Sequence, residues 1–407
     1  MKSRRVIVIG GGASGLVAAI TAAKEGALVT IIEQKDRLGK KILSTGNGRC
    51  NLTNEYMESK CFRGDDTAIV PVVLGQFGYQ ETVRFFEELG IILKSRQGYI
   101  YPISDQATTV LDVLKMEVSR LNIQVQLEES VTSIRKTKKG FQVKTDKANY
   151  NGDAVILAAG GKASPVLGSD GSGYGLAKEC GHSLSPVVPA LVQLKCKGSY
   201  FKQLAGIRTN AKVSLFVDGK FIDSDTGELQ LTNYGISGIP VFQISRYAAK
   251  ALYHKKRVVA KLDFLPMMSK EELIDFMEER KLLHGYKKVE EFLIGMFHQK
   301  LIGVLLKEAK IPSGFQAANL KSEQWNKLIE TIKNFATEVD GTNSFEQAQI
   351  CAGGVRTSEV DSQTLESIYT RDLYLTGELL DIDGICGGYN LQWAWATGFL
   401  AGKNAAK

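Results

Sequence analysis

The chain has 407 residues, of which 44% are apolar and 23% are charged, and this composition is typical of a globular protein. At roughly 150 residues per domain, the length predicts two to three domains. The 41 glycines, with only 8 prolines, exclude a collagen-like or proline-rich disordered chain. The formal net charge is +7, and the segment 190–345 carries 23 Lys and Arg against 17 Asp and Glu. These cations are interspersed with acids, so we expect a solvated basic surface rather than a nucleic-acid partner.

The sequence also argues against a membrane span and a metal site. No stretch approaches 18 uninterrupted apolar residues, as a transmembrane helix would require. The cysteines are widely spaced, and neither they nor the histidines follow a metal-ligand spacing. We therefore expect no metal, and reduced thiols as in a cytoplasmic protein. These residues are Cys50, Cys61, Cys180, Cys196, Cys351 and Cys386, and His182, His254, His284 and His298.

The first 33 residues predict a strand, a helix and a second strand. Val6–Ile9 is a continuous β-branched apolar run, as expected for a strand buried on both faces of a parallel sheet. A glycine-rich turn follows, and Leu16–Glu25 reads as a helix with small alanines for close packing. Gly26 can end that helix in a left-handed conformation, and Ala27–Ile32 is the second strand. These segments form one βαβ unit of an α/β fold.

The turn between the first strand and the helix carries the spacing Gly10-x-Gly12-x-x-Gly15, which in this context is a dinucleotide-binding fingerprint. Gly10 makes the tight turn, and Gly12 lets the backbone approach a pyrophosphate. Gly15 permits contact between helix and strand, while the helix N-terminus supplies N–H donors and partial positive charge. Glu33, at the end of the second strand, can accept hydrogen bonds from ribose hydroxyls. Its charge would repel a 2′-phosphate, so NADP fits this turn poorly.

Later segments favour FAD over NAD as the dinucleotide. The strand-like run from Tyr374 ends at Gly377 and Glu378, whose carboxylate can bond a ribityl hydroxyl that NAD lacks. The helix that starts near Asn390–Leu391 can direct backbone N–H groups at the N1/O2 edge of a flavin, where negative charge builds on reduction. A strand-to-glycine turn at Val155–Gly161 is also expected of such folds. Together these signals predict FAD.

The middle of the chain differs from the N-terminal region in composition and in predicted secondary structure. From about residue 190 to Leu262 it is rich in strands of Lys, Val and Phe, as in a separate antiparallel β unit. Ser269 and Glu272 form a capping box that opens a helix. Apolar residues then continue at helical spacing as far as Phe335. Residues 341–407 again contain glycine-rich segments, as the N-terminal region does.

Essentially the whole chain resembles a family of three-domain bacterial flavoproteins. This family is known as the aminoacetone oxidase family or NAD(FAD)-utilising dehydrogenases, and it includes a clostridial bile-acid reductase. Four sequence blocks carry the resemblance, and a fifth departs from the family pattern because Ile239 is inserted before its proline. The blocks are Ile9–Leu16, Gly39–Asn54, Ala158–Pro165 with Gly171–Tyr174, Thr376–Asp381 through Gly387–Trp393, and, as the fifth, Asn233–Pro240.

The resemblance implies an FAD-binding domain that is interrupted by an insert. The Rossmann-like, glutathione-reductase-like α/β domain would comprise residues 1–190 and 345–407. A β-barrel-like subdomain would occupy 191–265, and a helical subdomain would occupy 266–344. The changes in composition and predicted secondary structure near residues 190 and 345 agree with this division.

The loop from Lys40 to Asn54 is predicted to lie beside the cofactor. Lys40 and Lys41 adjoin the phosphate-binding turn, so they can neutralise the pyrophosphate. Polar side chains further along the loop should pass close to the isoalloxazine, where the charge of Arg49 would stabilise reduced flavin. The alternative is that these residues only shape the loop. Val131 is expected to face the adenine through its backbone alone.

The candidate cofactor-binding residues therefore come from separate glycine-containing segments along the chain. No catalytic residue is assigned, because a substrate amine that binds in its neutral form needs no strong base. The candidates are Gly10, Gly12, Ala13, Ser14, Gly15, Glu33, Gln34, Lys40, Lys41, Ser44, Asn47, Arg49, Val131, Ala159, Gly160, Gly377, Glu378, Gly388, Asn390 and Leu391.

The sequence has no second glycine fingerprint in βαβ context, so no separate NAD(P)H domain is expected. The resemblance favours an FAD-dependent oxidoreductase that takes hydride onto flavin N5 from a small primary amine similar to aminoacetone, with reoxidation by O2 to H2O2. A first alternative is NAD(P)H-dependent reduction of an unsaturated ketone or steroid-like substrate. A second is a flavin-bearing sensor or RNA-associated protein without enzymatic activity. The oligomeric state is not predicted.

Overall fold

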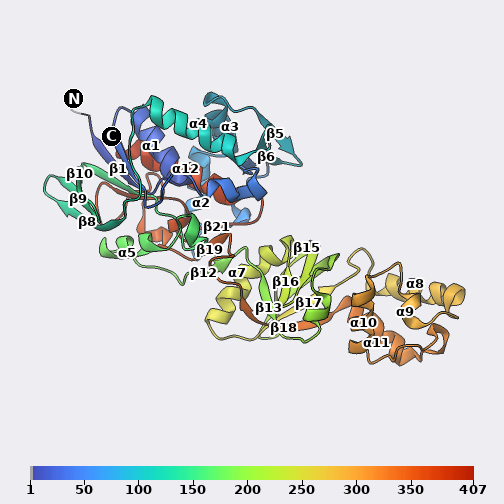
Figure 1. Ribbon diagram of the computed structural model, residues 1–407. Coiled ribbons are helices and arrows are strands. Elements are labelled where there is room, and N and C mark those ends of the chain that lie inside the picture. Colours follow the sequence, from blue (N-terminus) through green and yellow to red (C-terminus); the bar gives the residue numbers. More distant parts are fainter. Residues whose placement is uncertain (1–2) are drawn as a thin grey trace. The chain divides into compact units, whose positions relative to one another are not determined.

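The structure, a computed structural model, describes residues 3–407 and divides into two units (Figure 1). One unit is Met1–Pro189 together with Phe345–Lys407, and the other is Ala190–Ser344. The first unit is therefore built from both ends of the chain. All the candidate cofactor-binding residues belong to it.

A five-stranded parallel sheet forms the centre of the first unit, in the order β20-β11-β1-β2-β7. Apolar residues fill β1 and β11, and both strands are buried almost throughout, as expected when a sheet is covered on both faces. The predicted Rossmann-type α/β fold is confirmed. The strands are β1 (Arg5–Ile9), β2 (Leu28–Ile32), β7 (Gln124–Gln126), β11 (Ala154–Leu157) and β20 (Leu373–Leu375).

Helix α1 (Ala13–Lys24) follows β1 and packs closely against the C-terminal helix α12 (Tyr389–Ala405). Glycines of α12 allow this approach. A Cβ on Gly398 would lie 2.3 Å from the carbonyl oxygen of Ser14, and a Cβ on Gly402 would lie 2.3 Å from that of Ala18. The backbones therefore meet where any larger residue would separate the helices.

Smaller sheets and helices surround this centre. The sheets have the orders β10-β9-β8, β3-β6-β5, β21-β4 and β12-β19. Their strands are β3 (Thr53–Asn54), β4 (Phe62–Arg63), β5 (Leu93–Arg96), β6 (Tyr99–Pro102), β8 (Val131–Thr137), β9 (Gly140–Thr145), β10 (Asn149–Gly152), β12 (Val188–Ala190), β19 (Ile350–Ala352) and β21 (Asp383–Gly384). The helices are α2 (Ile69–Gln76), α3 (Tyr79–Glu88), α4 (Ala107–Arg120) and α5 (Ser172–Glu179), with a short 3-10 helix η1 (Ile42–Gly48).

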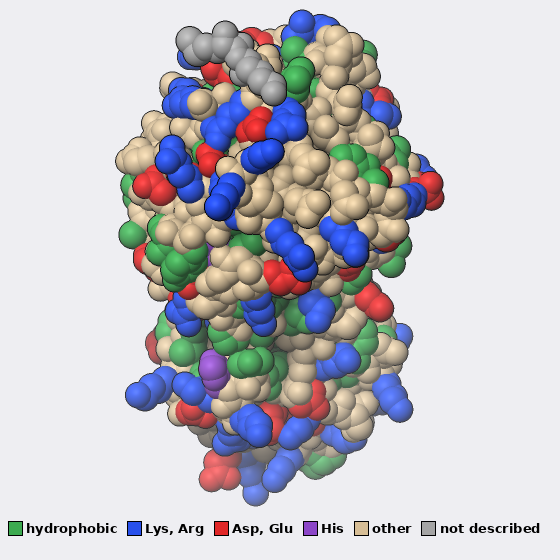
Figure 2. Space-filling model, turned by 90° about the vertical axis from the view of Figure 1, so that its left-hand side faces the viewer, with side chains coloured by type: hydrophobic (Ala, Val, Ile, Leu, Met, Phe, Trp, Pro, Cys, Tyr) green, Lys and Arg blue, Asp and Glu red, His purple; other side chains and the backbone are tan. Residues whose placement is uncertain are grey.

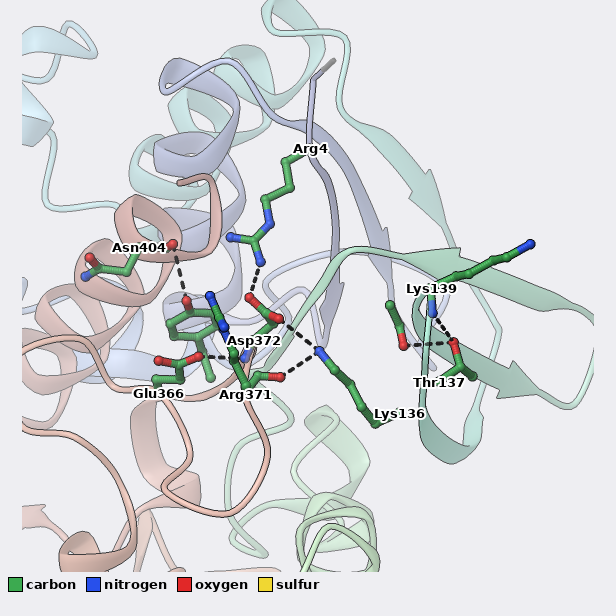
Figure 3. Close-up of polar contacts among 10 residues, drawn as sticks. Arg4, Lys136, Thr137, Lys139, Glu366, Arg371, Asp372 and Asn404 are labelled. Carbon is green, nitrogen blue, oxygen red and sulfur yellow. Dashed lines mark hydrogen bonds and ion pairs between the residues drawn. The ribbon is translucent and has the colours of Figure 1, made fainter. Parts of the chain in front are cut away.

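A cluster of ion pairs and hydrogen bonds links the N-terminal ends of the central strands to the sheet that contains β8 (Figure 3). The carboxylate of Asp372, next to β20, pairs with the guanidinium of Arg4 and with Lys136 Nζ at 2.9 Å. Lys136 also donates to the carbonyl oxygen of Arg371 at 2.8 Å. Burial alone would raise the pKa of Asp372, but the hydrogen bonds from Lys136 and Arg4 hold it below its ordinary value. The cluster lies at the opposite end of the strands from the glycine turns, so we assign it a structural role.

The second unit is built on a closed barrel in the order β13-β16-β15-β14-β17-β18. Its strands alternate buried and less buried residues, most regularly along β14, as a barrel with a filled interior requires. The strands are β13 (Leu194–Cys196), β14 (Arg208–Val217), β15 (Lys220–Thr232), β16 (Gly235–Ser237), β17 (Val258–Asp263) and β18 (Phe335–Thr342), with the short helix α6 (Phe201–Leu204) between β13 and β14.

The prediction of strands from residue 190 to Leu262 was wrong for one segment, because α7 (Ile239–Tyr253) is a helix within it. Gly238, with φ +106°, precedes the helix, and Pro240 stands in the first turn, where it costs no hydrogen bond. Its apolar stripe is buried in the core of the unit. Ile239, inserted relative to the family pattern, is the first residue of this helix.

The helical segment lies between two adjacent barrel strands. The capping box is confirmed, because Ser269 Oγ accepts from the N–H of Glu272 at 3.1 Å at the start of α8. The range 266–344 is not helical throughout, since Phe335 begins β18 and lies opposite Leu262 of β17. The helices are α8 (Lys270–His284), α9 (Val289–Phe292), α10 (Gln299–Glu308) and α11 (Ser322–Lys333).

The charged side chains are dispersed over the surface shown in Figure 2, where Lys and Arg alternate with acidic and uncharged residues. Within residues 3–407, no helix is long and apolar enough to cross a membrane. The same residues contain no group of three or more His, Cys, Asp or Glu side chains placed to hold a metal ion. All six cysteines are free thiols.

Candidate functional site

In the glycine turn after β1, Gly10 and Gly15 are tightly packed, whereas Gly12 borders open space. Gly10 has φ +101°, and a Cβ on it would lie 2.5 Å from the carbonyl oxygen of Ala158. A Cβ on Gly15 would lie 1.9 Å from the carbonyl oxygen of Gly10. In contrast, Gly12 caps α1, and apart from its two chain neighbours no residue has a heavy atom within 4 Å of its Cβ position. The turn therefore presents bare backbone and a helix N-terminus to a ligand.

Glu33 lies at the end of β2 beside this turn, and only 8% of its surface is exposed. Its two carboxylate oxygens accept from the N–H groups of Gly11 and Lys35, each at 2.8 Å. Burial raises the pKa of Glu33, although both hydrogen bonds oppose this. Each carboxylate oxygen can accept more than one hydrogen bond, so ribose hydroxyls can still bind here.

The turn at residues 168–172, which contains no predicted site residue, borders Glu33. Gln34 Nε2 donates to the carbonyl oxygen of Gly168 at 2.7 Å. Nearby, burial would raise the pKa of Asp170, but hydrogen bonds from Ser172 and Gln34 lower it below its ordinary value. The turn residues directly before α5 were the signal that could have identified this segment.

The two lysines predicted to face a pyrophosphate are both paired with carboxylates. Lys40 Nζ lies 2.9 Å from Asp36, and Lys41 Nζ lies 2.8 Å from Glu378. Glu378 also accepts from the N–H of Cys351 at 2.7 Å. The Lys41–Glu378 pair therefore joins the loop after β2 to the segment after β20.

Much of the loop from Lys40 to Asn54 is held by its own backbone conformation. Ser44 Oγ donates to the carbonyl oxygen of Lys41 at 2.8 Å, and Asn47 has φ +55°. These contacts favour a loop-shaping role for Ser44 and Asn47. Arg49 is exposed at the end of η1.

Three glycine turns meet at the carboxyl ends of β1, β11 and β20. Gly160 follows β11 with φ +71°, and a Cβ on Gly161 would lie 3.0 Å from the carboxyl carbon of Glu378. Gly377 follows β20 with φ +66°, and its Cβ would lie 2.8 Å from Ser14 Oγ. The predicted residues Ala13, Ser14, Ala159, Gly160, Gly377 and Glu378 are thus on segments that lie together at one edge of the sheet. This is the edge at which ligands bind in doubly wound α/β folds.

The start of α12 offers backbone rather than side chains. Gly388 has φ +94° and caps the helix. The side chain of Asn390 is bonded to the N–H and the carbonyl oxygen of Gly384 at 2.8 and 2.9 Å, and Leu391 packs partly buried against the core. The first N–H groups of a helix have no acceptor within it, so those of Asn390 and Leu391 remain suited to an electron-rich ligand edge.

Asn51 and Thr53, which belong to the loop predicted to lie beside the cofactor but were not named as site residues, fix this helix start. With its amide oriented to satisfy both ends, Asn51 accepts from the N–H of Gly388 at 3.2 Å and donates to the carbonyl oxygen of Thr53 at 3.0 Å. The fully buried Gln392 accepts from the hydroxyls of Thr53 and Thr82 at 2.7 and 2.8 Å. These contacts set the direction of the α12 axis.

Val131 stands apart from these segments as the first residue of β8, half-buried and opposite Thr145. Its adenine contact stays a prediction. The remaining features fit FAD: open space at Gly12, spare acceptor capacity at Glu33, and a helix N-terminus on the far side of the converging turns. Such a site defines a flavin-dependent oxidoreductase with a Rossmann-type domain.

Comparison with known proteins places the chain more narrowly. It belongs to the HI0933-like family, since the model described as "HI0933-like protein Rossmann domain" matches residues 4–404. The chain is an FAD-dependent oxidoreductase of this family, and the predicted cofactor FAD is confirmed. The aminoacetone oxidase branch stays a prediction.

Two relatives and one solved structure illustrate the similarity. The chain is 53% identical over 405 residues, 99% of both chains, to the "3-dehydro-bile acid delta(4,6)-reductase" of Clostridium scindens. It is 27% identical over 403 residues, 98% of this chain and 97% of the other, to the "Ribosomal RNA dihydrouridine synthase" of Escherichia coli. The open conformation of a flavocytochrome c3 fumarate reductase superposes with a TM-score of 0.52 at 15% identity. That match covers 100% of this chain and 78% of the other, and it shows the fold alone.

Replacing Glu33 by alanine should weaken FAD binding by about 1.5–3 kcal/mol, the range for hydrogen bonds to a charged group. Because the pKa of Glu33 is raised, its carboxylate ionises only as the pH passes above its ordinary value of 4.5, and the ionised form is the stronger acceptor. FAD affinity should therefore rise with pH in the natural protein and lose this dependence in the Glu33→Ala variant.

Fluorescence titration of FAD checks both effects. Glu25→Ala, at the exposed end of α1, is the control. Equal affinities in all three proteins would remove Glu33 from the site.

Proposed function

We propose that this protein reduces a carbon–carbon double bond conjugated with a ketone in a steroid-like substrate, with NAD(P)H as the electron donor. The observation that carries the proposal is the 53% identity, over 99% of both chains, with a protein named for the reduction of a 3-dehydro bile acid. The more distant relative is named for the synthesis of dihydrouridine, which also requires saturation of a double bond conjugated with a carbonyl group. The two names thus describe one class of reaction on different substrates.

The residues described above serve such a reaction by binding and orientation. When bound, FAD supplies the hydride-transfer chemistry. The open face at Gly12 and the carboxylate of Glu33 hold the dinucleotide end. The N–H groups at the start of α12 favour negative charge at their end of the site, and this stabilises the reduced cofactor. A single βαβ fingerprint in the sequence means that NAD(P)H meets the flavin without a nicotinamide domain of its own.

Anaerobic mixing tests this proposal directly. NADH or NADPH should bleach the absorbance of the bound flavin. A 3-oxo-4,6-diene steroid should then restore it, with one of the two conjugated double bonds saturated for each flavin that is reoxidised. Bleaching by aminoacetone and not by NAD(P)H would replace the reductase with an amine oxidase. A flavin that none of these compounds reduces would contradict both activities and favour a sensor.

A further inference from the structure

The three-stranded sheet β3-β6-β5 has one buried face and one face with aromatic and cationic side chains. Along β6, the side chains of Ile100 and Pro102 are buried. Those of Tyr99 and Tyr101, which alternate with them along the strand, are more exposed. Since successive side chains of a strand point to opposite faces, the two tyrosines share the more exposed face. Arg96 of β5 stands directly opposite Tyr99, and so belongs to this face as well.

This face adjoins both segments that are expected to touch the isoalloxazine. A Cβ on Gly387, directly before the α12 cap, would lie 2.9 Å from the Tyr99 ring, and Asn54 Nδ2 donates to the carbonyl oxygen of Gly387 at 3.1 Å. A Cβ on Gly46, in η1, would lie 3.6 Å from the Tyr101 ring. The tyrosines therefore extend outward from the flavin end of the site.

The charge on this face is positive. Lys94 Nζ lies 2.5 Å from Asp105 and so neutralises it, while the Arg96 guanidinium is 3.6 Å from the same carboxylate. The Arg96 guanidinium also stands 5.9 Å from the centre of the Tyr101 ring. The backbone N–H of Arg49 donates to the carbonyl oxygen of Gly46 at 3.2 Å, and Gly46 borders the Tyr101 ring, so Arg49 begins beside the same ring. Burial raises the pKa of Tyr101, and the charges of Arg96 and Arg49 act against this. Asp105 thus interacts with three cations, namely Lys94, Arg96 and Arg49.

We propose that Arg49, Arg96, Tyr99 and Tyr101, the tyrosine–arginine face, form a substrate-binding wall for a steroid-like acid. The tyrosine rings pack against the apolar ring system, and the guanidinium groups pair with its carboxylate. This inference rests on the proposed function, because that function supplies the flavin-adjacent substrate. It adds the residues that would bind the substrate's ring system and select its carboxylate.

The chemistry of the four side chains supports this occupant. Tyrosine offers a large apolar ring face with little loss of side-chain freedom. The guanidinium presents paired N–H donors that match a carboxylate, and it is less strongly hydrated than an ammonium group. Tyr99 is 38% exposed, so its ring is available to a ligand without any rearrangement of the core. Single-stranded RNA would use the same residue types, and is therefore a competing outcome of the test.

Binding without turnover isolates this face from the chemistry. We would titrate the oxidised FAD-loaded protein with a saturated 3-oxo steroid acid and with its neutral methyl ester, following the perturbation of the flavin spectrum. The variants are Arg96→Gln, Arg49→Gln and Tyr99→Ala. Arg135→Gln is the matched control, since Arg135 is exposed on β8, in a different sheet of the same unit (Figure 1). FAD content and melting temperature verify that each variant is folded.

The natural protein should bind the acid more tightly than the ester. Arg96→Gln and Arg49→Gln should each raise the Kd of the acid about 10-fold, with little change for the ester. Tyr99→Ala should raise both constants, and Arg135→Gln should change neither. Equal affinity for acid and ester, or an Arg96→Gln variant with an unchanged Kd, would overturn the inference while turnover of the steroid upholds the proposed function.

Failure of the proposed function has a different signature. In that case the natural protein neither binds nor reduces any steroid, and the steroid acid is rejected as the occupant together with the function. Displacement of the bound acid by a short single-stranded RNA, with loss of RNA binding in Arg96→Gln, would assign the tyrosine–arginine face to nucleic acid instead.

Discussion

Replacing Gly15 by alanine is expected to destabilise the first unit by about 3 kcal/mol and to abolish FAD binding, because the added methyl group has no room. Its carbon would lie 1.9 Å from the carbonyl oxygen of Gly10 and 3.3 Å from the side chain of Ala158. Backbone must shift to relieve the first contact, and that backbone forms the turn predicted to bind the pyrophosphate. Urea denaturation of the apo protein and FAD titration measure the two losses.

Gly12→Ala is the matched control, because it adds the same methyl group three residues earlier in the same turn. Its Cβ position has open space on all sides, and its φ of −82° is acceptable to alanine. The apo protein should therefore keep its stability. FAD affinity should nevertheless fall by about 10-fold or more, since the methyl group occupies the space that a pyrophosphate needs. Unchanged FAD binding in Gly12→Ala would show that the pyrophosphate does not approach this turn.

Replacing Glu378 by alanine should have the next largest effect. The variant leaves Lys41 without its carboxylate and Cys351 N–H without its acceptor, and both contacts are partly buried. The cost to folding should be about 1–3 kcal/mol for these unsatisfied donors. If the carboxylate also binds the ribityl chain, FAD affinity should fall by a further 10-fold or more, measured by equilibrium dialysis.

Lys41→Met separates these two roles of Glu378. It removes the same ion pair but leaves the carboxylate, which still accepts from Cys351. FAD affinity should therefore suffer less in Lys41→Met than in Glu378→Ala. Equal losses in the two variants would mean that Glu378 acts only by holding the loop through Lys41.

The parts of the fold that the sequence predicted well are those set by neighbouring residues. The turn at Gly10–Gly15 and the capping box at Ser269 each have their determinants within a few positions, and both are present in the structure. Local chemistry decides such elements before the rest of the chain is considered.

Contacts between residues that are distant in sequence could not be predicted. Lys41 and Glu378 are separated by 337 positions, so nothing near Lys41 indicated that its ammonium group would be engaged by a carboxylate. Phe335 continued the apolar spacing of the preceding helix, yet it pairs with Leu262 in the barrel. Its strand is defined by a partner beyond the helices, and no local pattern contains that information.

The discontinuous first unit has a consequence for the order of synthesis. Strand β20 completes the parallel sheet, and α12 covers α1 through Gly398 and Gly402, but both elements emerge from the ribosome after the whole second unit. A nascent chain that ends before Tyr389 holds the fingerprint turn but leaves α1 without the helix that packs on it. Such a chain exposes the alanines of α1 to solvent and to chaperones. The second unit has its own hydrophobic core, so it can fold before the last elements of the first unit have been synthesised. We therefore expect cofactor loading to wait until α12 has been synthesised, and chains that stop before it to lack flavin.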